Sequence, residues 1–292
     1  MALACGLAAT FNINAQNLYV ANTANNTIGE YTTSGSAVNP SLVSSGLNYP
    51  FAIVISGNDV FVANDDAGTV GEYTTSGALV NASLITGLSG PVSLAISGND
   101  LFVGSWISGT VGEYSTSGAT VNASLISGLH DPTGIAISGN NLFVANADSG
   151  TIGEYSTSGA TVSASLISGL NYPYGIAISG NDLFVVNNDG PLGEYTTSGA
   201  TVNASLINGP VAGLDEPIGI VISGNDLFVA NWGNGTVGEY TTSGAAVNTS
   251  LISGLQEPSA IAISSVPEPS GGAMAGLGVS VLWIWRRRKS RA

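Results

Sequence analysis

The side chains with a capacity for chemistry stand in the variable segments of a repeated sequence, and they are aromatic or acidic. The aromatic ones are Tyr49, Phe51, Trp106, Tyr172, Tyr174 and Trp232, and the acidic ones are Asp65, Asp66, Asp131 and Asp189. Aromatic faces flanked by carboxylates suit sugar rings or an extended polymer, because carboxylates accept hydrogen bonds from hydroxyl groups. These residues therefore predict a ligand-binding surface. The alternative is that the tyrosines only pack over the ends of strands.

Catalytic groups are scarce. His130 is the only histidine, and it stands beside Asp131 in a linking segment, where such a pair is more typical of a surface than of a general base. The sequence contains no nucleophile–base pair, phosphate-binding loop or paired-histidine metal motif. We therefore predict no catalytic residue.

A second acidic set belongs to the repeat itself. It consists of Glu30, Glu72, Glu113, Glu154, Glu194 and Glu239. A ring of carboxylates invites a calcium hypothesis, but successive copies should lie roughly 15 Å apart, where repulsion in water is only ~0.3 kcal/mol. Solvated or Ser/Thr-bonded glutamates are the expectation. Calcium held at Asp65–Asp66 or at Asp189 with loop carbonyls is a weaker alternative, and no other cofactor is predicted.

The charge distribution excludes one class of partner. The chain has 292 residues with 19 Asp and Glu against 5 Lys and Arg, and all five bases lie between positions 286 and 291. Nucleic-acid affinity depends on clustered Lys and Arg. A nucleic-acid partner is therefore excluded for the body of the chain.

An internal repeat organises the sequence. The tripeptide Gly-Glu-Tyr occurs six times, with its tyrosines 42, 41, 41, 40 and 45 residues apart, at Tyr31, Tyr73, Tyr114, Tyr155, Tyr195 and Tyr240. A period in this range is typical of arrays, solenoids and propellers.

Each repeat contains four short β-type runs rich in Ile, Val, Phe, Tyr and Thr, separated by Gly, Asn, Asp and Ser. In one copy the strands are expected at 135–138, 142–146, 151–157 and 161–167, with a tight hairpin turn at 139–141. Four antiparallel strands in about 42 residues predict one blade of a β-propeller. A β-solenoid is the less favoured alternative.

The blade number follows from counting strands. The last three strands of the unit occur six times, whereas the first strand occurs five times internally, starting at Phe51, Val92, Thr133, Tyr174 and Ile218. A sixth first strand, at 259–264, comes last. We predict an all-β, six-bladed propeller over residues 16–265, in which this final strand completes blade one and hides the open edges.

The blades resemble NHL-type repeats. The resemblance rests on Pro-x-Gly-Ile-Ala-Ile, then Leu-Phe-Val-Ala-Asn, then Gly-Thr-Val-Gly-Glu-Tyr, over residues 16–264. Asn64, Asn146 and Asn231 stand where NHL blades often carry Asp.

Two enzyme families are also similar in style. Gluconolactonase-like propellers hold a metal in the central channel with Glu, Asn and Asp, and virginiamycin B lyase relies on a catalytic His. Here the strands expected to line the channel read Ile-Ala-Ile-Ser or close variants, with no carboxylate and no histidine. A metal-dependent lactonase or streptogramin-lyase type of enzyme therefore remains an alternative only.

Variation between repeats points to one face. The connections between blades and those between the second and third strands vary, and in an up-down meander both fall at the same end of the ring. Tyr49, Phe51 and Trp106 belong to blades two and three. Tyr172, Tyr174 and Trp232 belong to blades five and six, so the two groups are expected on opposite sides of the ring.

The N-terminal segment 1–15 is apolar and looks like part of a secretion signal that lacks its basic start. The alternative is a strand at 10–14.

The C-terminal segment 266–292 resembles the PEP-CTERM sorting signal of Gram-negative bacteria. Its parts are Pro267-Glu268-Pro269, an apolar helix at 271–285, and the basic cluster Arg286, Arg287 and Arg288. The resemblance implies recognition by an exosortase in the inner membrane, followed by export to the envelope or extracellular matrix. Fifteen helical residues span only ~22 Å, so the transmembrane helix is a marginal anchor, with an ordinary tail anchor as the alternative.

These observations predict a monomeric, exported binding or interaction module, with a polysaccharide or protein ligand on the variable face. The alternatives are the propeller enzyme above and a purely structural matrix protein that binds nothing.

Overall fold

The computed structural model describes residues 16–209 and 212–264, of which Asn17–Ser264 form one compact unit. The expected signal-like segment, the sorting motif, the apolar helix 271–285 and the basic cluster lie outside the described residues. Within the described part, no helix is long and apolar enough to cross a membrane.

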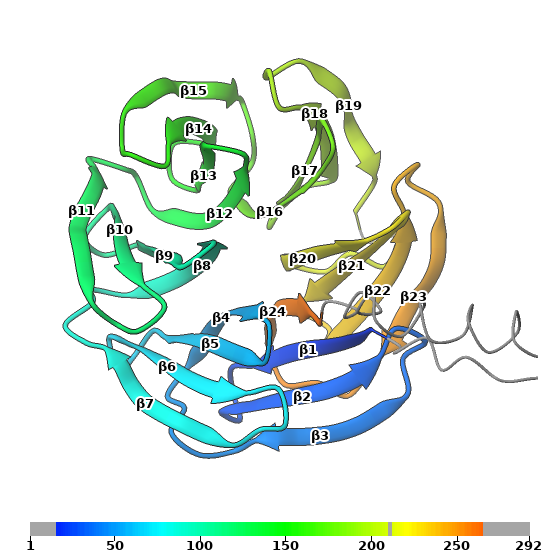
Figure 1. The fold of residues 1–292 in the computed structure, drawn as a ribbon. Helices are drawn as coiled ribbons and strands as arrows, with labels where there is room; N and C mark the ends of the chain where they lie inside the picture. The colour runs from blue at the N-terminus through cyan, green and yellow to red at the C-terminus, as the bar shows by residue number, and fades with distance from the viewer. Residues whose placement is uncertain (1–15, 210–211, 265–292) are drawn as a thin grey trace, which may run out of the picture. The chain divides into compact units, whose positions relative to one another are not determined.

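The predicted six-bladed β-propeller is confirmed. Six four-stranded antiparallel sheets stand around a central axis (Figure 1). The innermost strands, in order of blades one to six, are β24 (Pro258–Ile263), β4 (Pro50–Ser56), β8 (Pro91–Ser97), β12 (Pro132–Ser138), β16 (Pro173–Ser179) and β20 (Pro217–Ser223). The second strands are β1 (Asn17–Asn22), β5 (Asp59–Asn64), β9 (Asp100–Ser105), β13 (Asn141–Asn146), β17 (Asp182–Asn187) and β21 (Asp226–Asn231).

The outer half of each blade follows the same order. The third strands are β2 (Thr27–Thr32), β6 (Thr69–Thr74), β10 (Thr110–Ser115), β14 (Thr151–Ser156), β18 (Leu192–Thr196) and β22 (Thr236–Thr241). The outermost strands are β3 (Ala37–Val43), β7 (Leu79–Ile85), β11 (Thr120–Ser127), β15 (Thr161–Ser168), β19 (Thr201–Ile207) and β23 (Ala246–Ile252).

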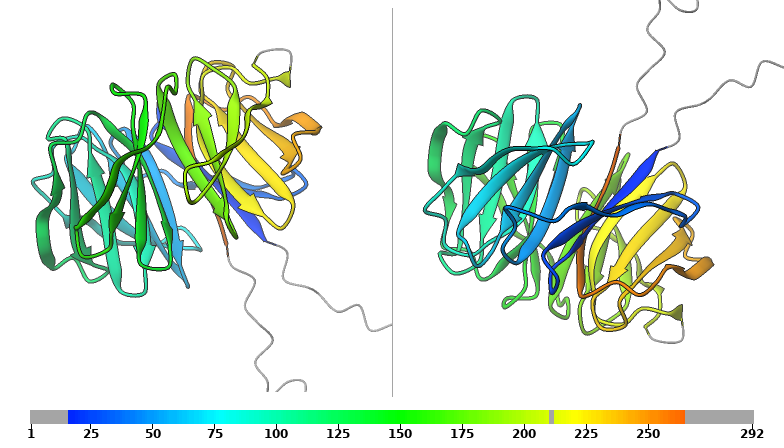
Figure 2. Two further views of the ribbon diagram at one scale, coloured as in Figure 1. Left: turned by 90° about the horizontal axis from the view of Figure 1, so that it is seen from above. Right: turned by 90° about the horizontal axis from the view of Figure 1, so that it is seen from below.

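The ring closes as expected, with the last strand in the first blade. Strand β24 pairs with β1 in the register Leu18↔Ile263 to Ala21↔Ala260. Both views of Figure 2 show the two strands side by side. The backbone N–H of Ser264 also donates to the carbonyl of Asn17 at 3.0 Å. Closure therefore hydrogen-bonds the open edge of β1.

The core lies between blades. Each of six buried clusters combines residues of two neighbouring blades, and the one between blades two and three contains Phe61, Leu101, Val103 and Tyr114. Since the second strand of each blade is covered on both faces, its Leu-Phe-Val run is buried without alternation.

The Gly-Glu-Tyr tripeptide has a packing reason. Residues two apart share a face of a strand, so the Tyr114 ring folds back over Gly112, where a Cβ would meet its Cε2 atom at 2.8 Å. Glycine is needed because the ring takes the space of a side chain.

The glutamates of the Gly-Glu-Tyr tripeptides have other neighbours than the expected solvent or Ser/Thr hydroxyl groups. Glu30 and Glu154 accept hydrogen bonds from the Asn17 and Asn141 amides at 2.8 and 2.9 Å, so the prediction of Ser/Thr partners is wrong for these two. The other four lie near an aspartate. Burial first, and then the aspartate charge, raises the pKa of these carboxyl groups, at Glu72, Glu113, Glu194 and Glu239.

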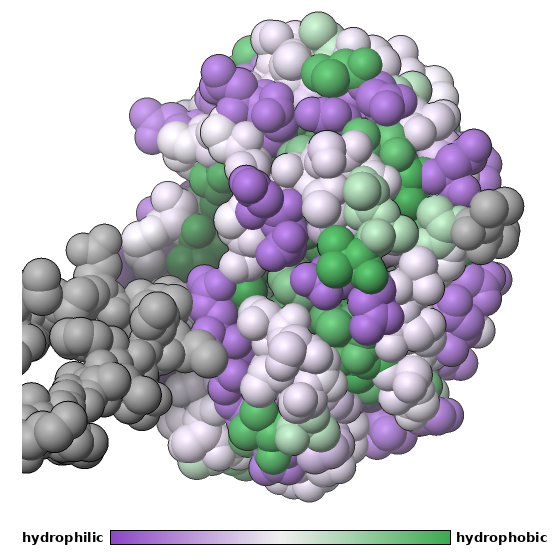
Figure 3. Space-filling model, turned by 90° about the vertical axis from the view of Figure 1, so that its right-hand side faces the viewer, coloured by the Kyte–Doolittle hydropathy of each residue, from purple (hydrophilic) through white to green (hydrophobic). Residues whose placement is uncertain are grey.

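The outermost strands carry exposed apolar side chains, mostly valines. Val121 and Val162, on β11 and β15, are each 59% exposed. On the side seen in Figure 3, apolar residues stand in small groups among polar ones. Scattered apolar residues of this kind are normal for a protein surface.

Candidate functional site

The two variable loop sets are tied together in every blade. The residue before the proline of the innermost strand accepts, at its carbonyl, a hydrogen bond from the residue after the second strand. The six bonds are 2.9–3.2 Å long and join Thr23 to Glu257, Asp65 to Tyr49, Trp106 to Gly90, Ala147 to Asp131, Asn188 to Tyr172 and Trp232 to Glu216. Both loop sets therefore lie at one end of the ring, as predicted.

The residue before each proline has a left-handed backbone. Gly90 occupies this position in blade three with φ 70°, and five non-glycine residues occupy it elsewhere, at Tyr49, Asp131, Tyr172, Glu216 and Glu257, with φ between 47° and 56°. Such a conformation costs an L-residue roughly 1–2 kcal/mol. Strain repeated in one loop set is a feature that often accompanies a functional site.

A hollow of about 260 Å³, which we call the mouth basin, opens at this end of the channel. Seven of its nine lining residues are predicted ligand-binding residues: Tyr49, Phe51, Asp65, Trp106, Asp131, Tyr172 and Tyr174. The other two, Val92 and Thr133, were not predicted, although both occupy the channel-facing position that Phe51 and Tyr174 occupy in their own blades.

The aromatic rings form one continuous row. Neighbouring ring centroids are 5.9–6.5 Å apart along the order Tyr49, Trp232, Phe51, Tyr174, Tyr172. The blade assignments hold, but the expectation of two groups on opposite sides of the ring is wrong. The side chains reach inward over the mouth, where residues of blades two, five and six meet.

Trp106 connects blade three to blade two. Its Nε1–H donates to Oδ1 of Asp65 at 3.1 Å. A Cβ at Gly90 would lie 2.5 Å from this Nε1 atom, so the glycine leaves room for the indole. Burial raises the pKa of Asp65, the hydrogen bond from Trp106 opposes this, and the charge of Asp66 adds to it.

A similar arrangement lies on the far side of the basin. The Tyr172 hydroxyl donates to Oδ1 of Asp148 at 3.3 Å. Burial and then the charge of Asp148 raise the pKa of Asp131, and hydrogen bonding from Tyr172 opposes the rise. Burial also raises the pKa of Tyr174, reinforced by the charge of Asp131.

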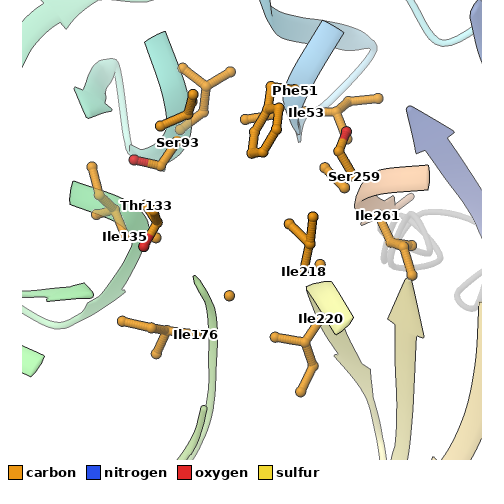
Figure 4. Close-up of a pocket in the computed structure, with 17 residues that line it drawn as sticks. Phe51, Ile53, Ser93, Thr133, Ile135, Ile176, Ile218, Ile220, Ser259 and Ile261 are labelled. Atoms are coloured by element: carbon orange, nitrogen blue, oxygen red, sulfur yellow. The ribbon is translucent and has the colours of Figure 1, made fainter. Parts of the chain in front are cut away.

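Below the basin the channel is apolar. A cavity of about 170 Å³ is lined by the innermost strands, and its labelled side chains are mostly Ile with three hydroxyl groups, on Ser93, Thr133 and Ser259 (Figure 4). The Thr133 hydroxyl donates to the carbonyl of Pro173 at 2.7 Å, and Ser259 to that of Pro50 at 3.2 Å. The residues lining this cavity include no histidine and no carboxylate.

Other predicted residues stand apart from the basin lining. Trp232 does not line the basin, but its ring contacts Tyr49 and Phe51, which do. Asp66 and Asp189 are exposed and do not line it, and His130 is exposed on its loop. Among the residues described, no three or more His, Cys, Asp or Glu side chains gather to hold a metal ion.

The asparagines at the ends of second strands have a local role. Asn64 Oδ1 accepts the backbone N–H of Asn48 at 3.1 Å, and Asn231 Oδ1 accepts that of Asp215 at 3.3 Å. In blade two this bond holds the loop that carries Tyr49, whereas the amide oxygens of Asn22, Asn146 and Asn187 accept no hydrogen bond.

Comparison with known proteins gives the fold alone. No protein-family model matches the chain. No curated protein sequence matches it either. Among solved structures, it is similar to a chain from a nidogen/laminin complex, with TM-score 0.73 and 14% identity over 86% of this chain and 99% of that one.

Two enzyme structures are similar at lower scores. A virginiamycin B lyase from Staphylococcus aureus has TM-score 0.55 and 19% identity over 78% of this chain and 73% of its own. A streptogramin B lyase has TM-score 0.54 and 19% identity over 88% and 75%. Propellers of protein complexes and of enzymes are thus both among the structural neighbours, so the likeness itself assigns no activity.

Proposed function

We propose that this chain is a binding module, related in style to NHL-type propellers, that takes its ligand in the mouth basin. The supporting observation is the continuous aromatic row beside two partly buried carboxylates at an open mouth. Constant strands that carry divergent loops on one face are a common arrangement in binding proteins. A polysaccharide or protein of the bacterial envelope or matrix is the proposed ligand source.

The proposed cellular location is inferred from the C-terminal end of the sequence. Pro267-Glu268-Pro269, the apolar stretch and the final arginines support export through a PEP-CTERM type of pathway with an exosortase as partner. The excess of carboxylates would keep such an exported domain soluble and would disfavour anionic polymers.

The enzyme alternative has less support. A lactonase or lyase needs a metal or a proton-transfer group at the channel, and the channel-lining residues carry no ionisable side chain. The streptogramin B lyase neighbour keeps the alternative open at the level of fold only.

Tryptophan fluorescence of the full chain tests the binding role. We expect neutral polysaccharides, or fragments of them, to cause a saturable change that is smaller in Trp106→Phe, where Trp232 remains as the reporter beside the basin. The variant Tyr49→Asn/Tyr172→Asn should weaken binding by about tenfold or more, because stacking on a ring contributes about 1 kcal/mol or more. Asn tolerates the left-handed backbone at both positions, so the fold should survive.

Val162→Ala is the matched control, since Val162 is exposed on the outer strand β15. No spectral change with any of the polysaccharides would favour the structural-matrix alternative, and equal weakening in this control would place the binding site outside the mouth basin.

A further inference from the structure

We propose that the mouth basin binds an alkylated ammonium group, with a quaternary ammonium head group as its best fit. This inference rests on the proposed binding role and names the chemistry of the ligand. Size is consistent with it, because the hollow of about 260 Å³ is small beside ligand clefts, which usually start near ~300 Å³. An ammonium head group fits within this volume, whereas a whole oligosaccharide is too large to enter it.

The π faces give the first part of the argument. Five rings lie in a row over the mouth, and a sixth ring, that of Trp106, also lines the basin. The face of an aromatic ring carries negative potential and attracts cations, most strongly for Trp and Tyr. N-alkyl groups also bury apolar surface against Val92 and Phe51, which belong to the same lining.

Charge complementarity gives the second part. Asp65 and Asp131 are partly buried in the lining, and the part of the chain that the structure describes contains no Lys or Arg. Four more carboxylates act on the basin tyrosines: Asp66 and Glu257 on Tyr49, and Asp148 and Asp189 on Tyr174. A partly buried carboxylate without a positive partner is unfavourable, and a bound cation would supply that partner.

Hydrogen bonding separates this ligand from its rivals. Three donors of the lining are already engaged: the indole N–H of Trp106 with Asp65, the Tyr172 hydroxyl with Asp148 and the Thr133 hydroxyl with a carbonyl. The hydroxyl groups of Tyr49 and Tyr174 are the side-chain donors that remain in the lining. A sugar needs donors as well as acceptors around its hydroxyl groups. A tetraalkylammonium ion needs neither, and gains from negative potential alone.

Two other cations fit less well. Calcium takes six to eight oxygen ligands, and the described residues offer no group of three or more carboxylates for it. Guanidinium prefers a carboxylate with both oxygens free for a bidentate pair. Asp65 already accepts a bond from Trp106, so only Asp131 of the lining could pair in this way.

The test compares two probes of the same shape by isothermal titration calorimetry with the full chain. Choline carries the quaternary charge, and 3,3-dimethyl-1-butanol replaces its nitrogen by carbon. We expect choline to bind at least about tenfold more tightly, with an affinity that falls as salt rises. The variant Asp65→Asn/Asp131→Asn should lower choline affinity by about tenfold or more while leaving the neutral probe unchanged.

The matched control is Asp59→Asn/Asp100→Asn. It removes the same two charges from exposed positions at the starts of β5 and β9, at the other end of the blades, and should keep choline affinity within about twofold. Retained binding of the neutral probe shows that the basin of the variant is intact.

The outcomes distinguish the two proposals. Equal affinity for both probes, or unchanged choline binding in Asp65→Asn/Asp131→Asn, overturns the ammonium inference and leaves a binding basin of another specificity. Heat from neither probe also overturns it, and the polysaccharide titration then decides separately whether the basin binds anything.

Discussion

Single residues shape the mouth basin through the backbone as much as through their side chains. Tyr49, Asp131 and Tyr172 hold a left-handed conformation that places each of them in the basin lining. Gly90 takes the same position in blade three without a side chain, and the Trp106 indole lies over it. The basin wall thus depends on which residue precedes each proline.

Gly90→Ala should displace Trp106. The added methyl group would stand 2.5 Å from Nε1, so the indole must move and its hydrogen bond to Asp65 must break. We expect the tryptophan emission to shift to longer wavelength and ligand affinity to fall by about fivefold to tenfold, since the ligand loses its contact with the indole face, which contributes about 1 kcal/mol or more. Fluorescence and calorimetry of the full chain measure both effects.

Gly87→Ala is the control for backbone strain. Gly87 lies in the same linking segment with φ 76°, but nothing lies within 4 Å of its Cβ position. Both variants should lose about 1 kcal/mol of stability from the left-handed backbone. If both leave the emission spectrum unchanged, the indole is not held against Gly90.

At this scale the sequence predicts the membership of the site but not its shape. The aromatic and acidic types, and the way they vary between copies, identify seven of the lining residues. The direction of each side chain depends on φ at the residue before proline. Contacts between rings of different blades depend on how far each aromatic side chain reaches. Neither follows from counting strands, and the contact of Trp232 with Phe51 at 6.0 Å was therefore missed.

At the scale of elements the repeat predicts nearly everything. Gly-Asn-Asp turns mark the hairpins, because each blade is an antiparallel meander. The buried Leu-Phe-Val type of run marks the second strand, because each blade packs between two neighbours. The hydrogen-bond partners of Glu30 and Glu154 were missed because they depend on a difference between repeats, not on what the repeats share. Asn17 and Asn141 replace an aspartate found in the other blades, and a difference of one atom type decides whether the glutamate accepts a bond or meets a second carboxylate.

The closing strand offers the sharpest test of an element. Ile261 and Ala262 of β24 are buried against blades six and two, respectively. Deleting residues 259–264 should lower the free energy of unfolding by at least about 3 kcal/mol, since loss of one buried Ile costs about 2–5 kcal/mol. Thermal unfolding followed by circular dichroism measures the loss. Deleting residues 287–292 is the control of equal length, and an unchanged melting temperature in the first variant would refute closure by β24.

In the part of the chain that the structure describes, the carboxylates have no Lys or Arg as counterions. The structure describes 18 of the 19 acidic residues and none of the five bases. Six of these carboxyl groups have a pKa above its ordinary value, mainly through burial: Asp65, Glu72, Glu113, Asp131, Glu194 and Glu239. A carboxyl with a raised pKa binds its proton more tightly in the folded state than in the unfolded chain. Its contribution is fully present below the unfolded pKa and is lost as the pH rises through the folded one.

The melting temperature of the full chain should therefore be higher at about pH 5 than at about pH 8, because the folded state binds protons at these groups before the unfolded chain does. The usual acid destabilisation arises from carboxylates that are paired with bases or hydrogen-bonded. The described residues contain no Lys or Arg to form such pairs, so hydrogen bonds such as those to Glu30 and Glu154 are what opposes the rise. Replacing Glu72, Glu113, Glu194 and Glu239 together by Gln should flatten the dependence. Salt gives an independent check, because screening should raise the melting temperature at about pH 8 more than at about pH 5. A melting temperature that falls on acidification over this range would contradict the account, since the hydrogen bonds that Glu30, Glu154 and Asp65 accept would then outweigh the effect of the carboxyl groups with a raised pKa.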